Sequence, residues 1–170
     1  MRRLLGLGML AVALGCGSGG TGNGTGGISG GGGGAGGAGA CVPVGGKLLS
    51  WFENGARQCA ISVSASHAVS GEVQLLQIGG GVTSGSFAFV ITTMGPIGGV
   101  YTCGSSATGF PSVLANYNGT AATTCTIDVT NSGTPGVTNA SGTFTATFTG
   151  GIGVPPTITS GVFDTPVTGS

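Results

Sequence analysis

Apolar and polar residues alternate with a period of two along most of the chain beyond residue 40. Residues 143–149 alternate threonine with phenylalanine and alanine, and residues 125–130 alternate Cys, Ile and Val with polar residues. Residues 87–91 are apolar at every position, which is typical of a central strand. Because successive side chains of a strand point to opposite faces, this pattern predicts strands and not helices.

The alternating segments are separated by glycine, asparagine and proline turn signals. These signals are Asn54-Gly55, residues 79–81, Gly95-Pro96, Asn118-Gly119 and residues 132–136. We predict strands near residues 47–52, 57–65, 72–78, 86–93, 99–103, 112–117, 122–130, 142–149 and 157–163. The chain beyond residue 40 is therefore expected to be all-β, an antiparallel β-sandwich of about 8–9 strands over residues 41–170, with a β-barrel as the alternative.

Composition changes abruptly before this domain. Fifteen of the 24 residues from 17 to 40 are glycine, and most of the others are Ser, Thr and Ala. Such a segment buries too little apolar surface to offset its chain entropy, so we expect a disordered, glycine-rich tether over residues 16–40.

The first residues have the pattern of an export signal. Arg2 and Arg3 precede an uncharged, mostly apolar run that is too short to span a bilayer, and we expect residues 1–15 to be a signal peptide. The run ends in Val12-Ala13-Leu14-Gly15-Cys16, which resembles the lipobox of bacterial lipoproteins, although Ala13 stands where that family prefers leucine. The resemblance implies acylation of Cys16, a membrane as partner and, since Gly17 follows, sorting to the outer membrane of the cell envelope. An ordinary secretory signal is the alternative.

Four cysteines remain in the expected domain: Cys41, Cys59, Cys103 and Cys125. In an exported chain an even number of cysteines predicts disulfides, and four allow three pairings. We favour Cys41–Cys59 with Cys103–Cys125. A metal site is the less favoured alternative because the short Cys-x₂₋₄-Cys spacing of structural zinc sites is absent.

Charge excludes some classes of partner. Only 5% of the residues are charged and the formal net charge is zero, so the basic patch of a nucleic-acid-binding protein is missing. No cofactor is expected, since the glycine-rich motifs of the chain lie in the predicted tether and not between a strand and a helix.

The sequence supplies few candidates for catalysis. His67 is the one histidine, and it falls between two predicted strands, where we expect an exposed loop residue. The acidic residues are Glu53, Glu72, Asp128 and Asp164, of which Asp128 is expected to face solvent. A hydrolase that uses His67 or a carboxylate pair remains a second alternative, but the expectation is that the protein is not an enzyme.

Four aromatic residues are candidate ligand contacts: Trp51, Tyr101, Phe110 and Tyr117. A lone tryptophan in a small β-domain more often belongs to the core, so we weight the core interpretation of Trp51 above the binding one. Together these aromatics support a carbohydrate- or peptide-binding module as the first alternative function.

The last third of the chain resembles a wider group. The segments Cys125–Thr130, Ser141–Phe148 and Ile158–Phe163 resemble the C-terminal strands of uncharacterised exported bacterial lipoprotein domains. That resemblance implies a small all-β domain with no known activity. We therefore expect a membrane-anchored cell-envelope lipoprotein whose β-domain has a structural or binding role, with an envelope glycan or protein as ligand.

Overall fold

The computed structural model describes residues 40–150 and 155–169, and these form β-strands without any helix. The predicted signal peptide and nearly all of the predicted tether lie outside the described residues. The strands are β1 (Leu48–Glu53), β2 (Ala56–Cys59), β3 (Ser62–Ser70), β4 (Val73–Val82), β5 (Gly85–Met94), β6 (Gly99–Thr102), β7 (Gly104–Ser105), β8 (Ser112–Tyr117), β9 (Thr120–Thr134), β10 (Thr138–Phe148), β11 (Thr157–Pro166) and β12 (Thr168–Gly169).

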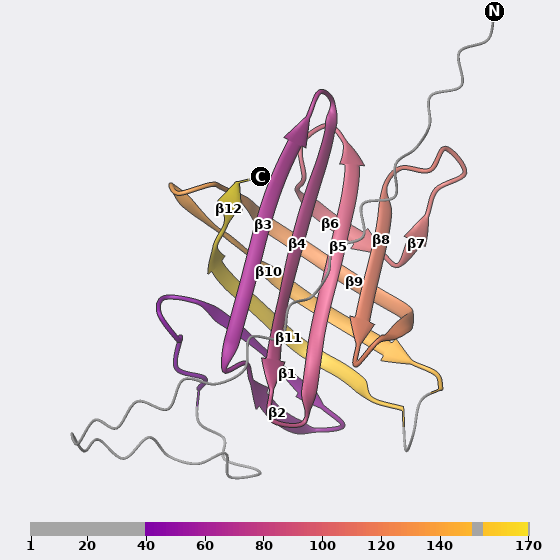
Figure 1. The fold of residues 1–170 in the computed structure, drawn as a ribbon. Coiled ribbons are helices and arrows are strands. Elements are labelled where there is room, and N and C mark those ends of the chain that lie inside the picture. Colours follow the sequence, from indigo (N-terminus) through magenta and orange to yellow (C-terminus); the bar gives the residue numbers. More distant parts are fainter. Residues whose placement is uncertain (1–39, 151–154, 170) are drawn as a thin grey trace, which may run out of the picture. The chain divides into compact units, whose positions relative to one another are not determined.

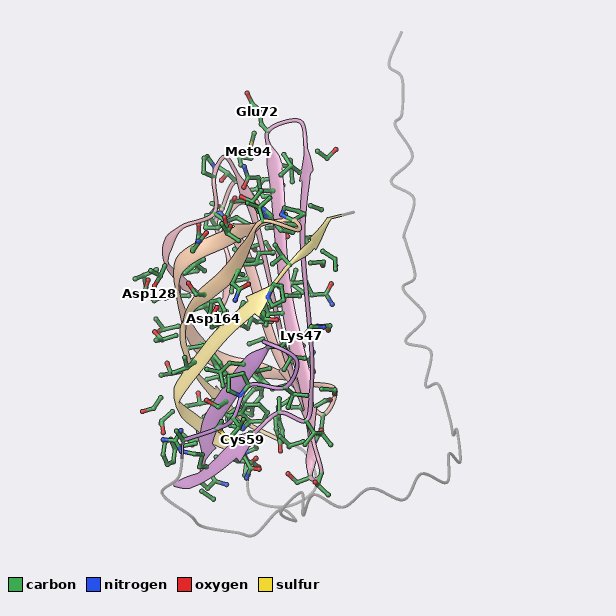
Figure 2. The ribbon with its side chains drawn as sticks, turned by 90° about the vertical axis from the view of Figure 1, so that its left-hand side faces the viewer. Lys47, Cys59, Glu72, Met94, Asp128 and Asp164 are labelled. Carbon is green, nitrogen blue, oxygen red and sulfur yellow. A yellow bond between two sulfur atoms is a disulfide. The ribbon has the colours of Figure 1, made fainter. Side chains whose placement is uncertain are left out.

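The strands form a curled, open sheet in the order β12-β3-β4-β5-β8-β9-β10-β11-β1-β2. All pairings are antiparallel except that of β12 with β3, and β6 and β7 lie off this path, on β9 and β8. Because the sheet curls, β3, β4, β5 and β8 form one layer, and β9, β10, β11 and β1 cross behind it (Figure 1). Buried and less buried side chains alternate along β5 in one layer and along β10 in the other. Figure 2 shows side chains on both sides of the ribbon, with Asp128 on the outside.

The core lies between these two layers. Phe87 of β5 stacks on Phe144 of β10 with ring centroids 4.6 Å apart, and Phe89 of β5 meets the edge of Phe163 of β11 at 5.3 Å. Such aromatic pairs add about 0.5–1.5 kcal/mol each beyond the burial of their area. All buried apolar residues of the described core fall between Leu49 and Val167. The apolar residues that alternate over residues 125–130 and 143–149 are all buried, so the alternation identified the inward faces of β9 and β10 correctly.

The expected number of strands was too low. The strand predicted over residues 57–65 is two strands, because the chain changes layers between Ala60 and Ile61. The Ala60 amide donates to the Leu49 carbonyl of β1, whereas the Ile61 amide donates to the Gly81 carbonyl of β4. The short strands β7 and β12 have two residues each, too few for any periodicity to reveal them.

The turn predicted at residues 79–81 was also wrong, because these glycines lie within β4 and pair with β3 and β5. A Cβ atom on Gly80 would come within 2.5 Å of the Ser62 carbonyl oxygen and 2.8 Å of Leu49 Cδ2. Glycine is needed here for close approach of backbones, not for a turn. The Asn54-Gly55 and Asn118-Gly119 turns are confirmed, and both asparagines have positive φ.

Threonines cover much of the outer face of the β9–β11 layer. Thr126 of β9 pairs with Thr145 of β10, and both are exposed. Asp128 is exposed on the same face, as predicted. In a chain with so few charges, these hydroxyl groups supply polar surface to this layer.

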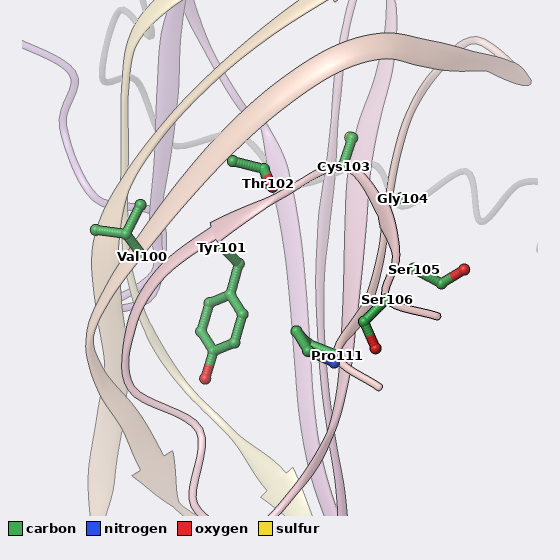
Figure 3. A pocket seen from close by; sticks show the side chains of 8 residues that line it. All are labelled: Val100, Tyr101, Thr102, Cys103, Gly104, Ser105, Ser106 and Pro111. Atoms are coloured by element: carbon green, nitrogen blue, oxygen red, sulfur yellow. The ribbon is translucent and has the colours of Figure 1, made fainter. Parts of the chain in front are cut away.

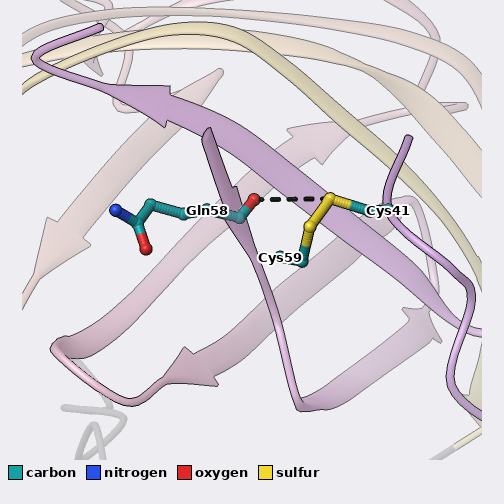
Figure 4. Close-up of a disulfide and its surroundings, with 3 residues drawn as sticks. All are labelled: Cys41, Gln58 and Cys59. Atoms are coloured by element: carbon teal, nitrogen blue, oxygen red, sulfur yellow. Dashed lines mark hydrogen bonds between the residues drawn. A yellow bond between two sulfur atoms is a disulfide. The ribbon is translucent and has the colours of Figure 1, made fainter. Parts of the chain in front are cut away.

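Two disulfides staple the domain. Cys41 is bonded to Cys59 at the end of β2, with the Cα atoms 5.5 Å apart. Figure 4 shows this bridge, with Cys41 Sγ 3.7 Å from the Gln58 carbonyl oxygen. Cys103 is bonded to Cys125 of β9, with the Cα atoms 4.9 Å apart. This is the pairing favoured above, and both Cα separations lie in the usual range of about 4.4–6.8 Å.

Candidate functional site

The structure divides the four candidate aromatic contacts into two pairs. Trp51 is 1% exposed and packs on Phe87, and Tyr117 is 7% exposed. Both belong to the core, the interpretation that was weighted more heavily for Trp51, and neither side chain is exposed enough to line a surface site. Tyr101 and Phe110 are half-buried and line the same surface cleft.

This cleft has two adjoining parts that share Tyr101 and Pro111. The first has a volume of about 290 Å³ and the second about 280 Å³. We call both parts together the Tyr101 cleft; its lining residues are Thr93, Met94, Pro96, Val100, Tyr101, Thr102, Cys103, Gly104, Ser105, Ser106, Thr108, Phe110 and Pro111. Figure 3 shows the first part, with the Tyr101 ring beside Pro111. Each volume is near the lower end of the range for small-molecule sites, about 300–1,000 Å³.

The cleft forms where the chain passes from one layer to the other. Residues of β6 pair with β9, and after Cys103 the residues of β7 pair with β8. The Cys103–Cys125 disulfide and the bond from the Cys103 amide to the Cys125 carbonyl, 3.1 Å, hold this crossing in place. The first part of the cleft is therefore built on a covalently fixed segment.

The opposite wall is a loop that is closed by its own hydrogen bonds. The Ser106 amide donates to the Pro111 carbonyl at 3.2 Å, and the Gly109 amide donates to the Ser106 carbonyl at 2.9 Å. The Thr108 hydroxyl donates to the Phe110 carbonyl at 3.1 Å, and the Ser106 hydroxyl donates to the same oxygen. The peptide bond between Phe110 and Pro111 is cis. These contacts position Phe110 and Pro111 before any ligand arrives.

The Tyr101 hydroxyl has a free donor function. It accepts a hydrogen bond from the Gly98 amide at 3.0 Å, and this contact leaves its own hydrogen available. Tyr101 thus offers a half-exposed ring and an oriented O–H donor, and both can contact a ligand.

The Tyr101 cleft is electrically neutral, since none of its lining residues is charged. The nearest acidic side chain in the register of β6 is Asp128, opposite Val100. Val100 lines the first part of the cleft, but Asp128 itself is not among the lining residues of either part. The cleft therefore offers no ion pair to a charged ligand.

The residues considered for catalysis do not share a common site. His67 is 9% exposed within β3, which corrects its expected place in an exposed loop. Its Nδ1 lies 2.7 Å from the Gly133 carbonyl and its Nε2 lies 3.2 Å from Gln74 Oε1. Both contacts tie β3 to its neighbours, and neither involves a carboxylate or a hydroxyl.

The carboxylates lie on different elements. Glu53 ends β1 and accepts a hydrogen bond from the Tyr117 hydroxyl at 2.9 Å, whereas Asp164 of β11 accepts one from the Asn139 amide at 2.7 Å. Burial, and then the hydrogen bond to Glu53 and its charge, raise the pKa of Tyr117 above its usual value. Among the residues that the structure describes, no three His, Cys, Asp or Glu side chains are grouped to hold a metal ion.

Sequence reasoning identified Tyr101 and Phe110 but missed most of the lining. The missed residues come mainly from residues 94–96 and 104–111, both treated as connections. The Gly-, Ser- and Pro-rich composition of residues 104–112 was the available signal, because binding residues often lie on ordered loops.

Comparisons with protein-family models, with curated proteins and with solved structures find no match for this chain. No helix in the described part of the chain is long and apolar enough to cross a membrane.

Proposed function

We propose that this protein is an exported lipoprotein of the cell envelope, anchored through Cys16, whose β-domain is a non-catalytic binding module. The observation that carries the binding role is the Tyr101 cleft, a neutral, aromatic-lined surface held by a disulfide and an internally bonded loop. Two disulfides also support an oxidising, exported location. Acylation of Cys16 in the outer membrane rests on the resemblance to lipobox sequences.

The architecture that we propose for the domain is a β-sandwich. Its support is that aromatic residues of β5 pack directly on those of β10 and β11, so the interior is filled by side chains from two facing layers. Continuity of the β8–β9 pairing around one side is the feature that would instead favour a barrel.

Anchoring is tested with a Cys16→Ser variant produced in a bacterium that has an outer membrane. We expect the unaltered chain in the outer-membrane fraction, with a mass that lacks residues 1–15 and includes acyl groups. The variant should not gain those acyl groups, and Ser18→Ala is the matched control that should. An unacylated chain, cut elsewhere and released in soluble form, would contradict the anchor.

Binding is tested with a soluble form in which an ordinary secretory signal replaces residues 1–16. The described core begins at Leu49, so this change removes none of it. We expect the soluble chain to sediment with isolated cell envelopes and Tyr101→Ala to reduce that binding. Leu114→Ala is the control, because Leu114 is an exposed apolar side chain on β8 that lies outside the cleft. Equal binding by all three chains would contradict a site at Tyr101.

A further inference from the structure

We infer that the Tyr101 cleft binds a neutral oligosaccharide, with neighbouring sugar units in its two parts. This inference rests on the proposed binding function and names the class of its ligand. It follows from three properties of the cleft: its lack of charge, the chemistry of its lining, and its division into two parts at Tyr101.

The first argument is electrostatic. Thirteen residues line the cleft and none is charged, so a carboxylate, phosphate or ammonium group would lose its hydration there without gaining an ion pair. The carbonyl of Glu72 accepts a hydrogen bond from the Gly95 amide, but Glu72 is not among the lining residues. A ligand without charge avoids that desolvation cost.

The second argument concerns the match between the lining and a sugar ring. A pyranose has apolar C–H faces and a rim of hydroxyl groups. Tyr101, Phe110, Pro96 and Pro111 supply aromatic and C–H surface for the faces. The free donor of Tyr101 and the hydroxyls of Thr102 and Ser105 supply polar donors for the rim. The hydroxyls of Thr93, Ser106 and Thr108 already donate to carbonyl oxygens of the protein and are left to act as acceptors.

The third argument is the arrangement of the two parts. Tyr101 and Pro111 line both, so a chain that passes over them contacts the 290 Å³ part and the 280 Å³ part in succession. A single sugar fills at most one part. Because the disulfide and the loop hydrogen bonds already fix both walls, little ordering of the protein is required on binding.

An extended peptide is the competing ligand, because β6 is paired on one side only, with β9. A peptide that added to this edge would rely on backbone hydrogen bonds and would depend little on the Tyr101 ring. The hydroxyl-rich, ring-sized parts of the cleft favour the saccharide.

The test is calorimetric titration of the soluble form, residues 17–170 with both disulfides, against neutral tetrasaccharides. The probes are tetramers of β-linked glucose, α-linked glucose and N-acetylglucosamine, each with its monomer, and a tetramer of galacturonic acid is the charged control. We expect at least one neutral tetramer to bind, more tightly than its monomer and with an affinity that salt does not change. The charged tetramer should not bind.

Variants assign the binding to the cleft. Tyr101→Ala should lower the affinity for the neutral tetramer about tenfold or more, as expected for a central aromatic contact. Tyr101→Phe should lose less affinity because the ring remains. Leu114→Ala should bind as the unaltered chain does. If Tyr101→Ala unfolds at a lower temperature than the parent, Phe110→Ala provides the same test on the other wall.

The outcomes separate the two proposals. If no neutral tetramer binds, or if binding ignores both Tyr101→Ala and Phe110→Ala, the saccharide inference is overturned. If envelope binding still depends on Tyr101 but is abolished by protease treatment of the envelopes or by high salt, the ligand is a protein or a charged polymer, and the proposed binding function survives alone. If neither envelopes nor sugars bind in a Tyr101-dependent way, both proposals fail.

Discussion

Two buried polar side chains of this domain, Tyr117 and His67, have partners far away along the chain. The Tyr117 hydroxyl donates to Glu53, 64 residues earlier, and His67 Nδ1 contacts the Gly133 carbonyl, 66 residues later. Each bond joins strands of the two different layers. A hydrogen bond of this kind contributes about 1–2 kcal/mol because its loss leaves a buried group unsatisfied.

The Tyr117–Glu53 bond has a pH dependence of definite sign. Burial and Glu53 raise the pKa of Tyr117 in the folded state, so protonated Tyr117 stabilises the fold fully below its unfolded pKa of about 10. That stabilisation is lost as the pH rises through the higher folded value. We expect Tyr117→Phe to lower the free energy of unfolding by about 1–2 kcal/mol at neutral pH and to make it fall less steeply in alkali.

Urea unfolding at about pH 7 and about pH 11 checks this difference, with the fluorescence of Trp51 as the probe. Trp51 is the one tryptophan and is 1% exposed, so unfolding should shift its emission to longer wavelength. Tyr101→Phe is the control, since Tyr101 lies in the cleft. An alkaline loss as large in Tyr117→Phe as in the parent would show that Tyr117 does not contribute to it.

Among the elements, β6 and β7 combine stability with the candidate site. They are short, they lie off the main path of the sheet, and they are joined through Cys103. With only a few backbone pairs on β9 and β8, they depend on the disulfide to Cys125 to hold the crossing.

We expect the double variant Cys103→Ala/Cys125→Ala to lose about 3 kcal/mol of stability and to bind envelopes less well. Cys41→Ala/Cys59→Ala is the matched control, because its sequence separation of 18 is close to the 22 of the other bridge. It should lose a similar amount of stability and keep its binding. Urea unfolding and envelope sedimentation measure the two effects, and equal binding by the two double variants would argue against a role for β6 and β7 in the site.

For the molecule as a whole, the described core is self-contained. Its buried apolar residues run from Leu49 to Val167 and include side chains from both layers of the curled sheet. One continuous interior of this kind is expected to unfold cooperatively.

Deletion of residues 19–38 should therefore leave the melting temperature of the domain unchanged. The composition of this stretch predicts a tether that contributes reach and not stability. Calorimetry of the soluble form with and without the deletion measures this. A variant in which the glycines of the same stretch are replaced by serine keeps the length of the chain and is the control. A clear fall in melting temperature on deletion alone would mean that the stretch packs on the domain.

The sequence by itself determined the strand class and the inward faces of β9 and β10. Alternation at residues 125–130 and 143–149 was sufficient for this, because the side-chain period of a strand is a local property. The Asn-Gly turns and Asp128 on the outer face were also predictable from nearest neighbours.

Only the tertiary structure decided which distant segments meet. It placed His67 inside, split residues 57–65 between two layers, and brought Tyr101 and Phe110 together while it buried Trp51 and Tyr117. Gly142 shows the same limit, since a Cβ there would lie 2.1 Å from the Asp128 carbonyl oxygen of a neighbouring strand. Local periodicity specifies the two faces of each strand, but pairing and layer contacts between residues far apart in sequence specify what each face touches.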